Sequence, residues 1–459
     1  MNISKFWKSS LGFSFFTFIS RIFGYLRDLV LSSNLGASAI HDIFVVIFRI
    51  PNVFRSFFGE GAMSQSLVPS IIEANQHQTR FLNQVFTLLV CILAVFVLFV
   101  ELFPAFFVTL FAPGYLADLG TLNNSTNFLR LIFPYILLIS LVAFFGAIQN
   151  SKKYFQVVAA TPIIFNITLI LFALSFSNLT LGVIGTSILI AGALQLILNV
   201  LYTAKLGYLP TFDFSFDASL LKTFFNRLLP AIFAAGIYQI NILVDTVFAS
   251  FLVTGSPTWL YLSERIIQLP LGMFGVAIAL VSLPNITELF KDNKSKELLK
   301  STMTGFASVS LIGFGAFLGL YFLSEPIIQM LFQRGEFLSS DTLQTSSSLL
   351  AYAFGLPFLM SNKFFNSIYF AVAKTKLVLW LGVFSLLLNI IFNYVFVYIF
   401  ELEHVGIALA TSISSIFVFT VSVAWLSLNK FFNKGAVLLA IAFIILIAIL
   451  ISNTYYLYG

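Results

Sequence analysis

The chain has 459 residues, of which 59% are hydrophobic, 17% aromatic and only 9% charged, with a formal net charge of +6. A mean hydropathy of +1.00 excludes an ordinary soluble domain, because so few polar residues could not cover a globular surface. One cysteine and three scattered histidines exclude a disulfide framework and argue against a metalloenzyme. The composition predicts a polytopic integral membrane protein. We also expect no enzymatic reaction and no cofactor.

Apolar stretches recur along the chain, and about thirteen of them reach the roughly 20 residues that cross about 30 Å of hydrocarbon. We expect all of them to be α-helices, because a segment in lipid must satisfy its own backbone hydrogen bonds. The predicted limits are 10–33, 39–60, 83–103, 129–149, 156–176, 180–203, 224–252, 258–284, 302–324, 346–372, 377–399, 404–427 and 435–454. The stretch 61–74 is interpreted as a broken continuation of the second span.

Arginines interrupt these apolar stretches, at Arg21, Arg27, Arg49, Arg55 and Arg265. A charge near the bilayer centre costs at least a few kcal/mol unless it reaches water, a partner or a ligand. Arg49 and Arg55 lie with Asn52 on one helical face, because the three residues follow one another at intervals of three. A polar cavity lined by guanidinium groups would suit an anionic cargo. The alternative is a network of ion pairs and carbonyl contacts that joins helices.

The basic residues outside the spans indicate the topology. They gather in alternate connections, most densely in the segment 291–300, while Arg334 is the clear exception in the intervening connections. By the positive-inside rule, the N-terminus and every even-numbered connection are cytoplasmic. The positive net charge is therefore mostly a topology signal and does not indicate a nucleic-acid partner.

Weak internal similarity predicts two lobes. Four landmarks recur in the same order at nearly constant spacing: the block of Arg49 and Pro69 with Arg265 and Pro284, Leu110, Phe111 and Gly114 with Leu331, Phe332 and Gly335, Pro134 with Pro357, and Asn166 with Asn389. An even number of spans separates the copies, so they form a parallel repeat, a common transporter plan. The predicted organisation is an N-terminal lobe at 1–210, a C-terminal lobe at 211–430 and an additional transmembrane helix at 431–459, in an all-α fold.

Polar groups in the second lobe add two candidates. Lys363 lies inside a predicted span, where it either makes a second basic contact with the cargo or extends its long stem toward the interface. Asp245, Asn389, Asn393 and Thr411 offer an oxygen cage with one negative charge, which would suit a monovalent cation such as Na⁺. Hydrogen bonds between helices are the alternative role for these four residues.

Several segments carry a family resemblance, namely SRIFGYLRDLVL at 20–31, FRIPNVFRSFFGEGAMSQSLVPS at 48–70, APGY at 112–115, FPYILLISL at 133–141, DTVFASFL at 245–252, SERIIQLPLGMFGVAIALVSLP at 263–284 and FQRGEF at 332–337. The chain resembles the bacterial MurJ (MviN) lipid II flippases of the multidrug/oligosaccharidyl-lipid/polysaccharide exporter superfamily. The resemblance implies a multi-pass protein of the bacterial inner membrane. It also implies transport of the undecaprenyl-diphosphate-linked peptidoglycan precursor from the cytoplasmic to the periplasmic leaflet.

The resemblance also implies a substrate cavity lined by charged and polar residues, at Arg21, Arg27, Asp28, Asp42, Arg49, Asn52, Arg55, Glu60, Glu264 and Arg265. We expect the arginines to surround the diphosphate, while Asp28 and Glu60 orient them in the empty state. Gln268 stands where some relatives carry an acid, which weakens any mechanism that needs a titrating carboxylate there.

The expected mechanism is alternating access, in which the arginines attract the head of lipid II while its tail stays in the bilayer. Movement of positive charge would couple the cycle to membrane potential at about 2.3 kcal/mol per charge per 100 mV, and a monovalent cation is a second coupling candidate. We expect a monomer that cooperates with the cell-wall machinery. The alternative is a cation-coupled multidrug exporter or an exporter of another lipid-linked oligosaccharide. Related flippases typically have fourteen spans, so we expect either a reduced groove for the lipid tail or a rearranged final pair of helices.

Overall fold

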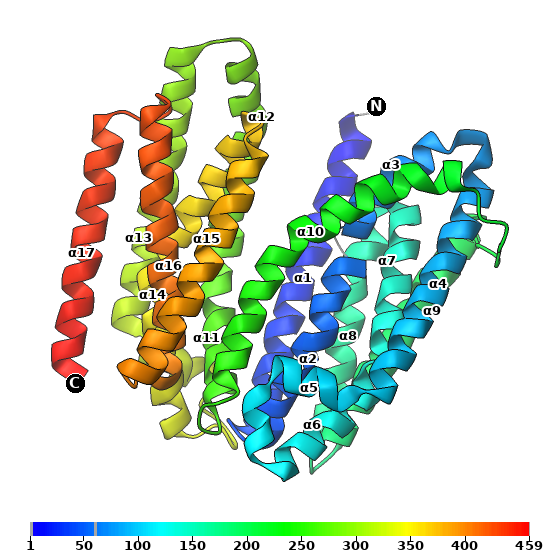
Figure 1. Cartoon of the computed structure of the whole chain (residues 1–459), viewed down its shortest axis with the longest axis horizontal. Helices are drawn as coiled ribbons and strands as arrows, with labels where there is room; N and C mark the ends of the chain where they lie inside the picture. The colour runs from blue at the N-terminus through cyan, green and yellow to red at the C-terminus, as the bar shows by residue number, and fades with distance from the viewer. Residues whose placement is uncertain (1–2, 59–61, 459) are drawn as a thin grey trace. The chain divides into compact units, whose positions relative to one another are not determined.

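The structure is a computed structural model that describes the backbone of residues 3–58 and 62–458. Every element in these ranges is helical, which confirms the all-α prediction (Figure 1). In chain order the α-helices are α1 (Ile3–Leu35), α2 (Ala39–Phe58), α3 (Ala62–Glu73), α4 (Gln78–Leu102), α5 (Pro104–Phe111), α6 (Leu119–Ile132), α7 (Tyr135–Ser151), α8 (Phe155–Ser175), α9 (Leu181–Lys205), α10 (Ala218–Ala249), α11 (Ser256–Pro270), α12 (Val276–Lys291), α13 (Ser295–Phe332), α14 (Ser339–Ala371), α15 (Thr375–Tyr394), α16 (Glu403–Leu428) and α17 (Lys434–Tyr458).

Four short helices join or extend these elements: η1 (Asn75–His77), η2 (Pro113–Ala117), η3 (Leu271–Gly275) and η4 (Val395–Ile399). Two of them, η3 and η4, are single π-helical turns. The first continues α11 into α12 directly after Pro270, and the second ends α15. Such turns relieve the backbone where a proline or a close neighbour interrupts the regular ladder of hydrogen bonds.

Nine helical segments in the described part of the chain are long and apolar enough to cross a membrane. They are Asn75–Leu102, Leu119–Ser151, Phe155–Ser175, Leu181–Lys205, Ser256–Lys291, Ser295–Phe332, Thr375–Ile399, Glu403–Leu428 and Lys434–Ser452. The remaining predicted spans lie in α1, α2, α10 and α14, which carry more charged or polar residues. The total of thirteen spans therefore stays a prediction.

The chain forms two compact units. The first contains Met1–Gly255 together with the short segment Arg334–Phe337, and the second contains Ser256–Gln333 and Leu338–Gly459. Helix α10, which begins the second lobe predicted from the repeat, packs in the first unit against α2 and α3. The compact units therefore divide the chain at other positions than the sequence repeat does. The lobe boundaries at 210 and 430 stay a prediction.

In the first unit, α1 lies against α8, while α9 packs on both α7 and α8 (Figure 1). Helices α3, α4, α7 and α10 share one hydrophobic cluster of buried side chains. Its members include Leu67 from α3, Phe81 from α4, Phe144 from α7 and Phe224 from α10. Helix α3 is the broken continuation of the second span that the sequence predicts, and its packing against both α7 and α10 explains why α10 belongs to this unit.

The second unit is organised around α14, which packs against α11, α12, α13 and α16. Small residues bring these helices together. A Cβ on Gly305 would lie 2.3 Å from the Phe364 ring, and a Cβ on Gly355 would lie 2.7 Å from Cα of Ser412. The Ser412 hydroxyl donates to the Ala351 carbonyl oxygen at 2.7 Å, so a hydrogen bond reinforces this close approach. The additional C-terminal helix that the sequence predicts is present as α17, which packs on α16.

Candidate functional site

Arg27 and Asp28 form a buried ion pair on α1, with 6% and 3% of their surfaces exposed. The Arg27 Nε and Nη2 atoms both donate to Asp28 Oδ1, at 3.0 and 2.6 Å. The Arg27 Nη1 atom donates to Oδ1 of Asn166 on α8 at 3.2 Å, and the guanidinium carbon lies 5.9 Å from the centre of the Phe165 ring. Asn166 in turn donates to the Ser20 carbonyl oxygen at 3.3 Å. The guanidinium is thus neutralised, and it joins α1 to α8.

Arg21 lies two turns before Asp28 on the same helix, and its side chain is exposed. Within the part of the chain that the structure describes, no hydrogen bond or ion pair holds this guanidinium. Arg21 and Arg27 therefore differ in environment although they belong to one helix. Of these two arginines, Arg21 is the one whose guanidinium N–H donors are exposed.

Helix α2 runs without a break through Pro51, so Arg49, Asn52 and Arg55 share one helix as predicted, and all three are half-buried. Arg49 Nη1 donates to Thr246 Oγ1 at 2.8 Å and to the Ile242 carbonyl oxygen at 3.4 Å, both on α10. This contact replaces part of the hydration that the charge would have in water. Arg49 therefore joins α2 to α10 in the first unit.

Asp42 is buried at the beginning of α2, with 4% of its surface exposed. Its Oδ2 atom accepts a hydrogen bond from the backbone N–H of Gly255 at 2.6 Å. The carboxylate thereby attaches the start of α2 to the connection that follows α10. Glu60, the remaining acid predicted on this side, lies outside the described residues.

The predicted residues of the second unit come from α11 and α14, two helices that pack together. Arg265 is exposed, and its Nη2 atom donates to the Tyr261 hydroxyl at 2.7 Å. The guanidinium carbon also lies 4.9 Å from the centre of the Tyr261 ring, so the same tyrosine orients the charge by a hydrogen bond and a cation–π contact. Glu264 and Lys363 are half-buried.

Three of the four residues predicted to hold a cation come together in the second unit. Asn389 and Asn393 are fully buried, and Asn393 Nδ2 donates to Asn389 Oδ1 at 3.1 Å. Asn389 Nδ2 donates to Thr411 Oγ1 at 3.2 Å. The fourth residue, Asp245, lies on α10 in the first unit. Among the described residues no three His, Cys, Asp or Glu side chains gather as metal ligands. Asn389, Asn393 and Thr411 therefore form a hydrogen-bonded network between helices, the alternative role expected from the sequence. Cation binding stays a prediction.

Sequence reasoning did not assign a role at this site to three groups that complete it: Asn166, Thr246 and the backbone N–H of Gly255. Asn166 stood out only as a landmark of the repeat, although an amide in the middle of an apolar helix is itself a signal of a polar contact. Thr246 follows the singled-out Asp245 directly, but a threonine hydroxyl can also bond to its own helix. Nothing in the sequence marks a backbone donor such as Gly255.

Comparison with known proteins identifies the family. Residues 31–458 match the family described as lipid II flippase MurJ. A probable lipid II flippase MurJ of Vibrio cholerae is 35% identical over 425 residues, which cover 89% of this chain and 80% of the relative. A protein of the same description from Buchnera aphidicola subsp. Acyrthosiphon pisum is 33% identical over 417 residues, covering 89% of this chain and 81% of the relative.

Solved structures give the same result. A lipid II flippase MurJ in an inward closed conformation matches with a TM-score of 0.81 and 29% identity, over 96% of this chain and 92% of that one. An inward-facing multidrug transporter of the MATE family matches with a TM-score of 0.73 over 90% of this chain and 94% of that one, but its 12% identity shows only the shared fold. Since the family match covers nearly the whole chain and relatives exceed 30% identity, the chain belongs to the MurJ family of lipid II flippases.

Proposed function

We propose that the protein moves lipid II, the undecaprenyl-diphosphate-linked peptidoglycan precursor, from the cytoplasmic to the periplasmic leaflet of the bacterial inner membrane. The observation that carries this proposal is the family match over residues 31–458. The many apolar helices agree with transport through a membrane, and the arginines within them agree with an anionic cargo. Transport of a lipid between leaflets requires no bond to form or break.

Four of the five arginines divide into two groups by their exposure and contacts, and the half-buried Arg55 is assigned to neither. Arg27 and Arg49 are held by partners on neighbouring helices, so we assign them to positioning α1 and α2. Arg21 and Arg265 are exposed, and we assign the phosphate contacts to these two residues. A guanidinium fork matches two phosphate oxygens at once, and Tyr261 orders the fork of Arg265 before the substrate arrives.

The transport cycle that we propose is alternating access with the N-terminus in the cytoplasm. Because Asp28 neutralises Arg27, the pair would carry no net charge through the membrane field, whereas Arg21 and Arg265 would. Each such charge that crosses the field contributes about 2.3 kcal/mol per 100 mV, so membrane potential is the coupling force that we favour. A monovalent cation at Asn389, Asn393 and Thr411 is the second coupling candidate.

Complementation of a flippase-depleted bacterium tests the function and the arginine assignment. We expect the wild-type protein to restore growth, and Arg21→Ala and Arg265→Ala to fail. Arg130→Ala is the matched control, because Arg130 is also exposed and its Nε atom donates to the Glu101 carbonyl oxygen of the neighbouring α4 at 3.3 Å, so this variant should rescue growth. Membrane fractions establish that every variant is inserted.

The outcomes separate two errors. If the wild-type protein is inserted but does not rescue growth, lipid II is not its substrate. If the wild-type protein and both arginine variants rescue, the substrate stands and the assignment of phosphate contacts is wrong. A multidrug exporter of the same fold is one of the two alternatives, but exposed guanidinium groups would repel the cationic drugs that such exporters carry.

A further inference from the structure

The connection between α9 and α10 contains an extended segment with two different edges. We call residues 209–217 the strap. Phenylalanine occupies its positions 212, 214 and 216, and polar residues occupy positions 211, 213, 215 and 217. In an extended chain successive side chains point to opposite sides, so the strap has one aromatic edge and one polar edge.

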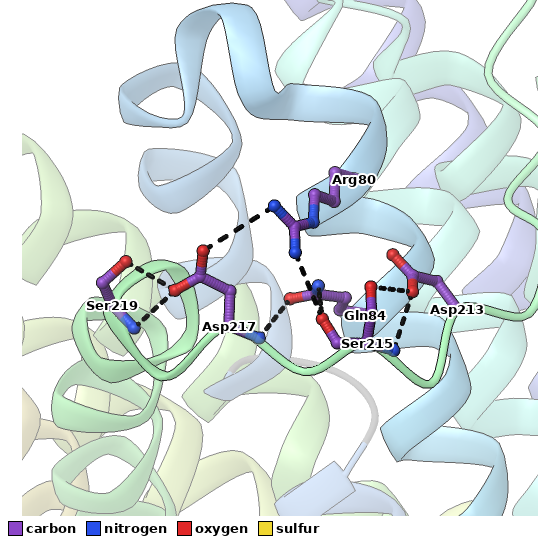
Figure 2. Close-up of polar contacts among 6 residues, drawn as sticks. All are labelled: Arg80, Gln84, Asp213, Ser215, Asp217 and Ser219. Atoms are coloured by element: carbon purple, nitrogen blue, oxygen red, sulfur yellow. Dashed lines mark hydrogen bonds and ion pairs between the residues drawn. The ribbon is translucent and has the colours of Figure 1, made fainter.

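The polar edge is bound to the first turns of α4 (Figure 2). Three backbone N–H groups of the strap donate to α4 side chains: Thr211 to Asn83 Oδ1 at 3.0 Å, Asp213 to Thr87 Oγ1 at 2.8 Å and Asp217 to Gln84 Oε1 at 3.2 Å. In the other direction, Gln84 and Arg80 both donate to the Ser215 carbonyl oxygen. Arg80 also lies 3.9 Å from an Asp217 carboxylate oxygen. These bonds hold the backbone of the strap against α4.

The aromatic edge is left outward. Phe212, Phe214 and Phe216 are 59%, 67% and 47% exposed. Their rings form a continuous ladder, because the centre of the Phe214 ring lies 6.3 Å from that of Phe212 and 6.4 Å from that of Phe216. Phe212 also lies 5.3 Å from Phe86 of α4, which holds the ladder against the helix. A contiguous apolar surface of this kind marks a binding surface rather than a solvated loop.

The position of the strap indicates what covers this surface. Its partners on α4 lie near the beginning of the segment Asn75–Leu102, which is apolar enough to cross a membrane. Farther along the same helix Val95 and Leu98 are 68% and 59% exposed, as expected for side chains that face lipid. Exposed lysines stand on either side of the strap, Lys205 at the end of α9 and Lys222 at the start of α10. Phenylalanine beside lysine suits the boundary between acyl chains and anionic head groups.

We propose that the strap is an interfacial membrane anchor. Its three phenylalanine rings enter the lipid boundary of the leaflet in which α4 begins, while its polar edge holds it to α4. The strap leads directly into α10. Its last residue, Asp217, caps that helix, because the Asp217 carboxylate accepts a hydrogen bond from the Ser219 N–H at 2.9 Å. The anchor thereby fixes the depth at which α10 begins in the membrane.

Spin labels measure this depth directly. The only cysteine, Cys91, is replaced by serine, and single cysteines are introduced at Phe212, Phe214 or Phe216 for labelling. The protein is placed in vesicles of phosphatidylethanolamine and phosphatidylglycerol, and the accessibility of each label to oxygen and to the water-soluble complex Ni(II)-EDDA is compared. Val95 supplies a lipid reference and Asn293, in an exposed turn, supplies a water reference.

We expect the oxygen to Ni(II)-EDDA ratio at all three positions to rise toward that of Val95 and away from that of Asn293. A ratio equal to that at Asn293 would overturn the proposal, because the rings would then face water. Protection from both reagents would also overturn it, because protein would then cover the rings. Phe214→Trp in the same vesicles gives a second measurement that does not depend on labelling: brominated lipids should quench the added fluorescence, and absence of quenching contradicts the anchor.

Discussion

At the scale of single residues, neutralisation decides what a membrane arginine does. Arg27 keeps its charge below the surface because Asp28 lies 2.6 Å away and Asn166 supplies an acceptor from α8. Arg21 has the same side chain on the same helix and stays exposed. The residue type sets the desolvation free energy of a buried guanidinium. The neighbouring side chains determine whether a partner within the protein or a bound ligand offsets that free energy.

The ion pair gives a stability prediction. Asp28→Asn leaves the Arg27 guanidinium buried without its counter-charge, which typically costs about 3–5 kcal/mol. We therefore expect a clear fall in melting temperature in detergent, and partial recovery in the double variant Asp28→Asn with Arg27→Gln. Asp118→Asn is the control, since Asp118 caps α6 at the surface and asparagine caps equally well. Equal melting temperatures for Asp28→Asn and Asp118→Asn would contradict the buried-pair argument.

Two glycines give a second prediction at this scale. Gly335 has φ of +58°, and a Cβ there would lie 2.2 Å from the Ser33 carbonyl oxygen. The adjacent Glu336 N–H donates to that same oxygen at 2.8 Å, so the turn cannot move away without losing a hydrogen bond. Gly207 also has a positive φ, +78°, but nothing lies within 4 Å of its missing Cβ.

Gly335→Ala should therefore lower the melting temperature more than Gly207→Ala. Both variants incur the backbone strain of a left-handed residue, about 1 kcal/mol, and only the first adds a clash with a carbonyl oxygen. Thermal unfolding of the two purified variants in the same detergent makes the comparison. Equal losses for the two variants would show that the shared backbone strain, and not the close contact at Gly335, sets the cost.

At the scale of elements, α10 shows how an apolar helix is assigned to one unit. Arg227 near its beginning pairs with Glu73 of α3 at 2.6 Å and donates to Ser70 of the same helix at 3.3 Å. The strap before α10 is bound to α4, and α10 contributes to the hydrophobic cluster shared with α3, α4 and α7. Local hydropathy predicts that a helix exists here, but these contacts determine its neighbours.

The strap should also respond to acid. Hydrogen bonds from the hydroxyl and the backbone N–H of Ser215 hold the pKa of Asp213 below its usual range. A carboxyl group whose pKa is lowered by folding stabilises the folded state at any pH above its pKa in the unfolded chain, near 4. That stabilisation is lost as the pH falls through the lower pKa of the folded state. Below pH ~4 we expect a spin label at Phe216 to become more mobile, because the turn at Ser215 loosens. Asp213→Asn should give a label mobility that depends less on pH, and an unchanged acid response in this variant would assign the effect to another group.

At the scale of the whole molecule, the span count determines which side of the membrane holds the C-terminus. Thirteen spans and a cytoplasmic N-terminus place the end of α17 in the periplasm. We expect alkaline phosphatase fused after α17 to be active and green fluorescent protein fused there to be dark. A fusion after Lys205, at the end of α9, should give the opposite pattern as an internal control. Bright fluorescence from the fusion after α17 would refute the count of thirteen.

The sequence by itself determined the all-α class, most of the membrane-crossing segments, the separate helix α3 and the family. These properties depend on local composition, since each helix in lipid satisfies its own backbone, and on motifs such as RIPNVFR at 49–55 that can be read in order. The candidate residues could be named for the same reason, but their roles could not.

Only the tertiary structure decided which arginines are neutralised, where α10 packs and which edge of the strap is free. The partners are distant in sequence: Arg27 and Asn166 are 139 positions apart, and Arg49 and Thr246 are 197 apart. A charge is sequestered or exposed by side chains that folding brings within about 3 Å, and single-sequence hydropathy carries no record of that distance.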